Sequence, residues 1–490
     1  MSQKKVIIIG AGITGLCAGI NLKKAGFDTE IFEMHSLPGG MCTAWSRKGY
    51  TFDGCMDWLL GSSPDGYFHN MWREVGAIDD TTKAIEYDIF TEIELSSGKN
   101  FKVYTDPDKL RKEMIELAPG DSKEINKLIG LVKTFSKMNF PNNFWDMLKL
   151  VPFALANMGD AIRLRKLFSI DVKDYLQNFN NPELKEALAE SFDANICAIA
   201  FVMMLGYMAR KSAGFILGGS LEFAKRIEQK YISLGGIVHY NSQVIQIITE
   251  EDKVDGIRLA NGDVHLADYI VSAADGYDTI FRMLKGRYTS PIIGEAYSTW
   301  AIFPGIVQVS LGVAKEFNNE PPNLNFILKN KITIDTKSIA SRINVQIFNF
   351  DPTLAPAGKT ALTLMHLADY EYWSTLRVNN KEEYNKQKDR IAQETIDALD
   401  IRFPGLKEKV EVVDVATPAT YERYNNEWKG SWEGFWPSAV QIRKSLPSTL
   451  PGLNNFWMAG QWLKPGGGLP TALMEGKRVC RDICKTVKKK

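Results

Sequence analysis

The chain has 490 residues, and its 59 Lys and Arg balance 58 Asp and Glu to give a formal charge of +1. This balance argues against a nucleic-acid-binding protein, which needs a surplus of basic residues. Apolar residues make up 45% and charged residues 24%, as in ordinary globular proteins. The 25 Phe, 17 Tyr and 11 Trp argue against disorder, and the length predicts two or three domains.

Cysteine and histidine usage indicates neither a disulfide framework nor a metal site. The six cysteines include no C-x-x-C pair, and the five histidines lack ligand spacing. The longest apolar run, residues 196–209, is shorter than the 18–20 residues of a membrane span. The N-terminus lacks the pattern of a signal peptide, so we expect a cytoplasmic protein.

The first 33 residues carry a dinucleotide-binding pattern. Residues 6–9 form a β-branched run typical of a strand covered on both faces. A predicted helix over 16–25 and a strand over 29–32 follow, and an acid, Glu33, comes next. This is the context that a G-x-G-x-x-G motif requires, with free helix N–H groups for a pyrophosphate and an acid for a ribose. The motif residues are Gly10, Ala11, Gly12, Ile13, Thr14 and Gly15.

The following segment indicates which dinucleotide binds. Met34 begins a stretch that reaches Gly39-Gly40-Met41, and residues 49–54 read Gly-Tyr-Thr-Phe-Asp-Gly. This pattern resembles the phytoene desaturase, carotenoid isomerase and retinol saturase group of flavoproteins, within the amine-oxidase-like superfamily. The resemblance implies that the two glycines pass beside the pyrophosphate and ribityl chain of FAD. The family's usual Arg after them is Met41 here, which removes a charged contact and favours the carotenoid isomerase branch.

Two later segments extend the resemblance over the whole chain. A helix over 221–234, a turn and a strand lead to Val244, whose counterpart in the family meets the adenine through its backbone. Near the end, a glycine-rich stretch precedes a helix over 472–485 and resembles the C-terminal flavin motif. The N-terminus of that helix could stabilise negative charge on a reduced flavin. The candidate residues here are Gly460, Gln461, Gly467, Gly468 and Leu469.

The resemblance implies an α/β protein, with a Rossmann-type FAD-binding domain of the GR2-like kind and an inserted α+β substrate domain. We expect the FAD domain to be discontinuous, and no second nucleotide motif follows a strand. The cofactor segments are residues 1–82, 212–285 and 445–490; the substrate segments are 83–211 and 286–444. The first insertion has mainly helical patterns, over 108–117, 121–137, 181–192 and 196–209. The second has strand patterns over 300–312, 323–328, 343–349 and 360–367, and a helix over 381–402.

No nucleophile–base pair is evident, and Asp53 and Trp58 are the candidate catalytic residues. Flavin chemistry fits this, because the cofactor takes or gives the hydride and the protein orients the substrate. The helix over 195–210 is a core helix or the wall of an apolar tunnel. We therefore predict an FAD-dependent oxidoreductase or isomerase that acts on a long hydrophobic polyene or isoprenoid, carotenoid- or retinoid-like, by hydride exchange at flavin N5.

Desaturation, saturation and cis–trans isomerisation are all open. The alternatives are a flavin amine oxidase and a non-enzymatic prenyl-binding escort. The expected partner is a hydrophobic small molecule, with peripheral membrane contact through residues 144–168 and the lysines at 488–490. A helix packed on the core and a solvated tail are the other explanation of those segments, and the oligomeric state is open.

Overall fold

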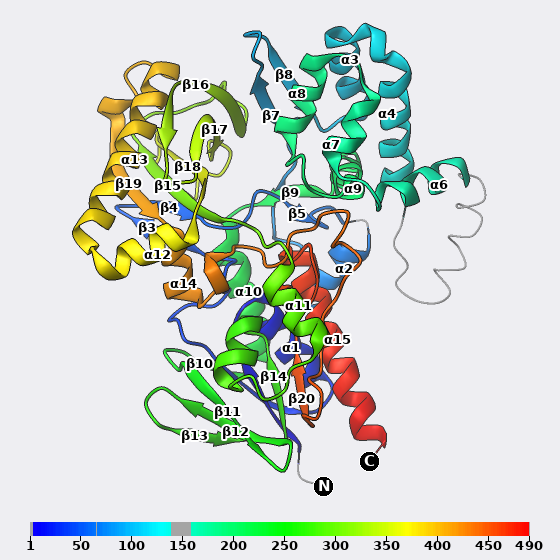
Figure 1. Ribbon diagram of the computed structural model, residues 1–490, viewed down its shortest axis with the longest axis vertical. Helices are drawn as coiled ribbons and strands as arrows, with labels where there is room; N and C mark the ends of the chain where they lie inside the picture. The colour runs from blue at the N-terminus through cyan, green and yellow to red at the C-terminus, as the bar shows by residue number, and fades with distance from the viewer. Residues whose placement is uncertain (1–2, 65, 139–157, 490) are drawn as a thin grey trace.

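The computed structural model describes residues 3–64, 66–138 and 158–489 (Figure 1). Its lower half is built on a five-stranded sheet in which every pair of neighbours is parallel. In spatial order the strands are β10 (Ile237–His239), β2 (Asp28–Phe32), β1 (Lys5–Ile9), β14 (Tyr269–Ser272) and β20 (Phe456–Met458). The start, middle and end of the chain therefore share one sheet, which is the predicted Rossmann-type arrangement.

Three helices pack beside one another on this sheet: α1 (Ile13–Lys24), α10 (Gly219–Ser233) and α15 (Gly468–Lys489). A Cβ at Gly19 would lie 2.7 Å from the Tyr231 ring, and one at Gly476 would lie 2.6 Å from the Cys17 Cβ. Glycine at these two positions thus allows α1 to approach both neighbours closely.

A small antiparallel sheet packs with residues of β1 and β2 in a separate core. Its strands are β11 (Val244–Glu250), β12 (Lys253–Leu259) and β13 (Val264–Leu266). The predicted Asn-Gly hairpin is confirmed, because β12 and β13 pair across it and Gly262 has a φ of 97°. The predicted single strand leading to Val244 is wrong. It is divided into β10 and β11 because Asn241 turns the chain with a φ of 53°.

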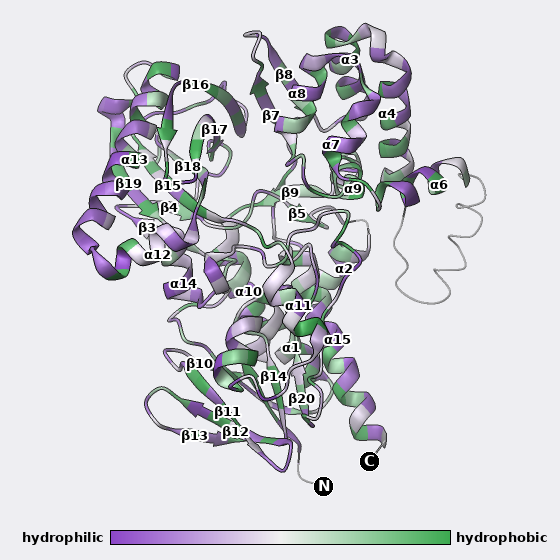
Figure 2. Ribbon diagram, in the orientation of Figure 1, coloured by the Kyte–Doolittle hydropathy of each residue, from purple (hydrophilic) through white to green (hydrophobic). Residues whose placement is uncertain are grey.

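A seven-stranded sheet occupies the upper left of Figure 1, and its last two strands, β7 (Ile89–Glu94) and β8 (Asn100–Tyr104), lie at the upper centre beside the helical lobe. Its strands in spatial order are β19 (Val410–Ala416), β15 (Gly305–Val313), β18 (Thr360–Ala368), β17 (Ile339–Ile347), β16 (Asn323–Thr333), β7 and β8. Helices α12 (Tyr370–Asn379) and α13 (Lys381–Arg402) pack on one face and share a core with it. Both helices are coloured largely hydrophilic in Figure 2, as expected for a covering layer.

The first insertion also supplies a helical lobe, at the upper right of Figure 1. It comprises α3 (Pro107–Leu117), α4 (Ser122–Ser136), α6 (Met158–Leu167), α7 (Val172–Tyr175), α8 (Pro182–Ser191) and α9 (Ala198–Ala209). Helix α9 packs closely on α4, since a Cβ at Gly206 would collide with the Phe135 ring. Sequence reasoning missed β7 and β8. They belong to the first insertion in sequence but pair with the sheet that the second insertion forms.

Shorter elements connect these units. They are β3 (Ala44–Arg47), β4 (Tyr50–Asp53), β5 (Leu59–Leu60), α2 (Tyr67–Glu74), β6 (Ala84–Ile85), β9 (Ala213–Ile216), α11 (Pro291–Thr299) and α14 (Pro418–Asn425). Of the segment 144–168, for which we predicted membrane contact, residues 144–157 lie outside the described residues. No helix in the described part of the chain has the length and apolar composition needed to cross a membrane.

The packing of α13 gives a test of the core. Leu399 is completely buried against the seven-stranded sheet, whereas Ile401 on the same helix is 60% exposed. We expect Leu399→Ala to destabilise the protein by about 2–5 kcal/mol, because it leaves a cavity. Ile401→Ala serves as the matched control and should change stability by under about 0.5 kcal/mol. Equal shifts of the two variants in thermal unfolding would contradict this packing.

Candidate functional site

The first glycine motif forms a tight turn between β1 and α1. Gly10 has a φ of 96°, and a Cβ at Gly15 would collide with the Gly10 carbonyl oxygen. Helix α1 begins at Ile13, and no side chain caps its N-terminus. Its first N–H groups are thus available to an anion, as the predicted pyrophosphate site requires.

The second glycine turn lies against the first. The Gly39 N–H donates to the Ala11 carbonyl at 2.9 Å, and Gly12 and Gly39 form an isolated parallel bridge. Gly39 and Gly40 both have positive φ, at 111° and 61°. A Cβ at Gly40 would lie 3.3 Å from the Gly12 Cα. Larger residues would close the space in which a pyrophosphate and ribityl chain could pass.

Glu33 lies at the end of β2, beside the first turn. Its Oε2 accepts from the Ala11 N–H at 2.7 Å, and its Oε1 accepts from the His35 N–H at 2.8 Å. The side chain is buried, and this desolvation raises the pKa of the carboxyl although the backbone donors oppose the shift. The carboxylate is therefore held at the carboxyl edge of the sheet, where a ribose would bind.

A cleft of about 280 Å³ opens next to Glu33. Met34 forms one side, and the loops before β11 and after β12 form the rest. The lining residues are Met34, Asn241, Ser242, Gln243, Leu259, Ala260 and Asn261. Val244, predicted to meet the adenine through its backbone, follows Gln243 and pairs with Leu259. The cleft is the expected place for the adenine end of a dinucleotide.

The C-terminal motif reaches the same edge from the other side. Gly460 has a φ of 125°, and its position lies against Thr14, since a Cβ there would be 3.9 Å from the Thr14 Oγ1. Gly468, with a φ of 75°, begins α15. Leu469 is half-buried against the large core cluster. The structure thus brings the N-terminal and C-terminal glycine motifs together.

Gln461 and Met41 make contacts that the sequence did not indicate. The Gln461 amide donates to Glu427 at 3.2 Å, and the Trp462 indole donates to the same carboxylate at 3.0 Å. The Met41 sulfur accepts from the Asn425 amide at 3.1 Å, so this side chain faces α14. Both residues are therefore positioned by the segment between α14 and residue 434.

Sequence reasoning missed two acids on that segment: Glu427, which is buried, and Glu433, which is partly buried. Burial raises the pKa of Glu427 well above its usual range, and the charge of Asp275 adds to this shift. Glu433 lies against the C-terminal glycines, because a Cβ at Gly467 would be 2.6 Å from the Glu433 carbonyl oxygen. Burial, with the charge of Asp57, raises the pKa of Glu433 to about 7. The sequence offered one signal for Glu433: it is an acid within a short segment, residues 428–436, that is rich in Gly and Trp.

Asp53 and Trp58, the candidate catalytic residues, have different surroundings. Asp53 is fully buried, and its carboxylate accepts from the Ser220 N–H and hydroxyl, both at 2.6 Å, and from the N–H groups of Cys55 and Met56. These bonds tie β4 to the N-terminus of α10 and support a positioning role. Trp58 packs edge-on against Phe90 at 5.4 Å, within the apolar region. A catalytic role for either stays a prediction.

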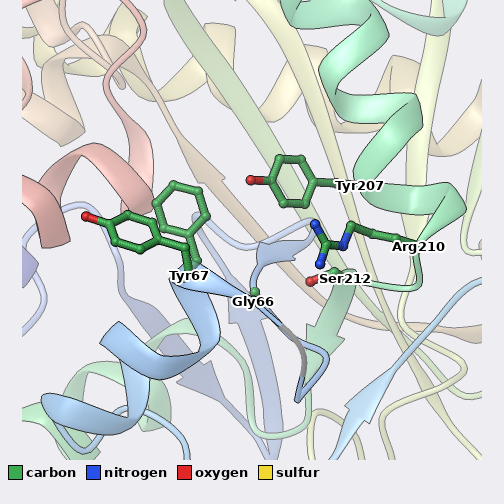
Figure 3. Close-up of a pocket in the computed structure, with 7 residues that line it drawn as sticks. Gly66, Tyr67, Tyr207, Arg210 and Ser212 are labelled. Carbon is green, nitrogen blue, oxygen red and sulfur yellow. The ribbon is translucent and has the colours of Figure 1, made fainter. Parts of the chain in front are cut away.

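A small pocket of about 10 Å³ lies where α2 meets α9. Figure 3 shows Tyr67 on one side and Tyr207, Arg210 and Ser212 on the other. The Arg210 guanidinium donates to the Met138 carbonyl at 3.0 Å. This volume holds no more than about one water molecule. The pocket is therefore a packing gap between the helical lobe and the rest of the chain and not a ligand site.

A family model described as flavin containing amine oxidoreductase matches residues 13–484. The chain belongs to this family. Prolycopene isomerase 1 of an Oncidium hybrid cultivar is 24% identical over 97% of this chain and 84% of its own length. Phytoene desaturase (neurosporene-forming) of Rhodobacter capsulatus is 21% identical over 98% of this chain and 94% of its own length. The resemblance to carotenoid desaturases and isomerases is therefore confirmed.

Solved structures of other proteins share the fold of this chain. An oxidoreductase from Methanosarcina mazei has a TM-score of 0.63 at 17% identity and covers 97% of this chain and 100% of its own. A putrescine oxidase has a TM-score of 0.60 at 14% identity and covers 99% of both chains. The family match and the similarity to carotenoid desaturases and isomerases show that the protein is an FAD-dependent oxidoreductase. The paired glycine turns, the uncapped start of α1 and the cleft beside Glu33 fit this cofactor.

The position of Glu33 leads to a prediction for FAD binding. We expect Glu33→Ala to weaken FAD binding by about tenfold or more, because a bond between a charged acceptor and the ribose is lost. Glu30→Gln is the matched control on the same strand, where Glu30 pairs with Lys5 and His239 instead. Titration of apoprotein with FAD, followed by flavin fluorescence, measures both. Unchanged affinity in Glu33→Ala would overturn the assignment of this residue.

Proposed function

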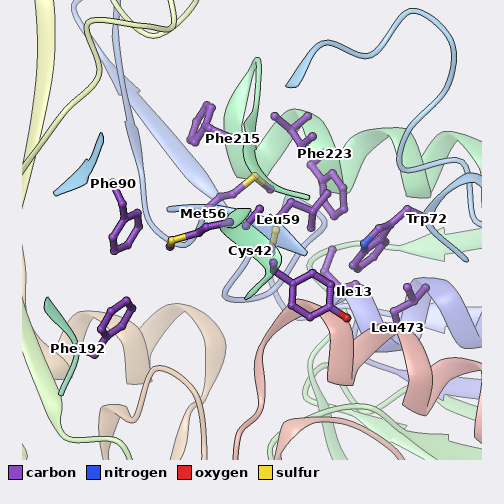
Figure 4. Close-up of a cluster of buried hydrophobic side chains, with 14 of the residues drawn as sticks. Ile13, Cys42, Met56, Leu59, Trp72, Phe90, Phe192, Phe215, Phe223 and Leu473 are labelled. Atoms are coloured by element: carbon purple, nitrogen blue, oxygen red, sulfur yellow. The ribbon is translucent and has the colours of Figure 1, made fainter. Parts of the chain in front are cut away.

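We propose that the protein is an oxidoreductase or isomerase of a long hydrophobic polyene or isoprenoid. The observation that carries this proposal is a continuous apolar cluster (Figure 4). It runs from Ile13 and Leu473 beside the glycine motifs, through Met56, to Phe90 and Phe192 between the seven-stranded sheet and the helical lobe. A hydrophobic chain bound along this direction would place one of its carbon–carbon bonds next to the cofactor site.

The proposed roles of the chain's residues follow from their positions. The glycine turns and the start of α1 would bind the pyrophosphate, and Glu33 the ribose. FAD, when bound, supplies hydride exchange with a carbon atom of the substrate. Trp45 and Trp432 pack with Tyr421 in one small hydrophobic cluster, the aromatic group of the site. Both indole N–H groups are buried without a hydrogen-bond partner. They can orient a flavin or a substrate while excluding water.

The relatives support a polyene rather than an amine. The full-length matches include a prolycopene isomerase and a phytoene desaturase, whose names refer to polyenes. The likeness to putrescine oxidase, at 14% identity, reflects the fold alone. The prenyl-escort alternative is not favoured, because the glycine turns leave room for a dinucleotide. Whether the net reaction is desaturation, saturation or isomerisation is the question for experiment.

Anaerobic incubation tests the reaction class directly. Oxidised and reduced holoenzyme should be mixed with carotenoids, retinoids, unsaturated lipids and amines, and the flavin spectrum and the products recorded. We expect a polyene or isoprenoid to bleach or reoxidise the flavin, or to change isomer. Turnover of amines alone would overturn the proposed substrate class.

We also propose that α6 touches a membrane surface and that the protein works in the cytoplasm. Met158 and Ile162 are 60% and 53% exposed, and Arg163, Arg165 and Lys166 are exposed beside them. Exposed apolar side chains next to basic ones suit an anionic lipid surface.

Vesicle sedimentation tests this contact. We expect the protein to bind phosphatidylcholine vesicles only when phosphatidylglycerol is included, and the Arg165→Glu/Lys166→Glu variant to bind several-fold less. Lys386→Glu/Lys388→Glu, on the distant helix α13, reverses the same number of charges and is the matched control. Absence of binding to anionic vesicles would contradict the proposal.

A further inference from the structure

A row of polar side chains crosses one face of the seven-stranded sheet. Ser310 of β15 is opposite Thr363 of β18, Thr363 is opposite Gln346 of β17, and Gln346 is opposite Asn323 of β16. Directly opposed residues on neighbouring strands point to the same face. All four side chains are more than nine-tenths buried. An unbroken polar row is unusual in a buried sheet, where apolar side chains stabilise the fold.

The row faces away from the helices that cover the sheet. The adjacent positions along the strands, Val309, Val345 and Leu364, belong to the same apolar core as Trp373 of α12 and Leu399 of α13. Because side chains alternate along a strand, the polar row lies on the opposite face.

That face looks toward the segment that follows β4. The Gln308 amide, two residues before Ser310 and on the same face, donates to the Asp53 carbonyl at 3.2 Å and to the Ser310 hydroxyl at 3.2 Å. Tyr421, of the aromatic group with Trp45 and Trp432, donates to the Gln308 side chain at 2.7 Å. The polar row therefore adjoins the region assigned above to the flavin and the substrate.

The Thr363 Oγ1 has no hydrogen-bond partner, and the Gln346 Nε2 has none at ordinary hydrogen-bond distance, although the Asp57 carboxylate lies close enough for this amide to lower its pKa. The other two are satisfied, since Ser310 accepts from Gln308 and Asn323 donates to the Phe90 carbonyl at 3.1 Å. An unsatisfied buried donor costs about 1–3 kcal/mol, which an apolar side chain of the same shape would avoid. The two free groups, side by side on neighbouring strands, are suited to a ligand with a polar atom.

One acid, Asp57, lies beside the Gln346 amide, and a second acid, Glu433, lies near Asp57. Burial raises the pKa of Asp57 to about 6, the charge of Asp53 raises it as well, and the nearby Gln346 amide opposes both. The charge of Asp57 in turn contributes to the raised pKa of Glu433, so the two carboxyls are neighbours. At its other end the row meets Phe90, which stacks on Phe192 in the apolar cluster.

We propose that Gln346 and Thr363 bind the oxygen-bearing end of an otherwise hydrophobic substrate: a hydroxyl, a carbonyl or a carboxylic acid. This inference rests on the proposed function and narrows it, because a pure hydrocarbon would leave both groups unsatisfied. The amide N–H donates to the ligand oxygen, and the Thr363 hydroxyl donates or accepts according to the end group. The apolar chain lies along the cluster that begins at Phe90.

The test compares two probes on the FAD-loaded enzyme: geranylgeraniol and the same C20 tetraene without its hydroxyl. Tryptophan fluorescence quenching and the flavin spectrum give the dissociation constants. We expect the alcohol to bind about tenfold more tightly than the hydrocarbon. Thr363→Val and Gln346→Leu should each remove most of this preference without weakening hydrocarbon binding, and Thr363→Ser should retain it.

Thr360→Val is the matched control on the same strand. Its hydroxyl donates to the Lys315 carbonyl at 2.8 Å, so the variant should lose stability but keep the preference for the alcohol. Equal binding of both probes to the wild type would overturn this proposal and leave the proposed function standing. Binding of neither probe would overturn both. Loss of FAD from Thr363→Val would assign the row to the cofactor site and also overturn the proposal.

Discussion

The structure depends on the close approach of three separate backbone segments at one edge of the parallel sheet. The turn after β1, the turn at Gly39 and the turn at Gly460 meet within contact distance, through one hydrogen bond and glycines with positive φ. No side chain other than hydrogen fits at Gly15 without displacing the Gly10 carbonyl. The result is a cradle of backbone N–H groups at the start of α1, which suits a pyrophosphate.

The rest of the architecture follows from the way this edge is assembled. The strands that form it come from residues 5–9, 28–32, 237–239, 269–272 and 456–458, so the chain must leave the sheet and return to it. The segments between build the seven-stranded sheet and the helical lobe. The parallel pairing of β7 with β16 joins the two insertions, and the apolar cluster continues into both.

Sequence patterns predicted correctly the elements whose contacts lie within a short stretch of the chain. The strand, glycine turn and helix that precede Glu33 follow from hydrophobic runs and glycine spacing, and the helix over 381–402 was predicted to the residue. The break at Asn241 could not be predicted, because it depends on one residue adopting a positive φ. β7 and β8 pair with each other locally, but they join the sheet only through β16, more than 200 residues away, so this attachment could not be predicted from the local sequence.

The polar features of the site were harder to predict than its glycines. The contacts of Glu427 with Gln461 and of Asp53 with Ser220 join residues 34 and 167 positions apart. The polar row on the seven-stranded sheet comes from the register of four strands, which no single strand encodes. Such groups are the ones that distinguish a substrate within a shared fold.

Hydrogen–deuterium exchange with and without FAD tests the convergence of the three turns most directly. We expect FAD to slow exchange together in peptides covering residues 9–16, 33–42 and 459–470, and to leave α13 unchanged. Protection confined to the N-terminal glycine turn, with residues 459–470 unaffected, would contradict the account.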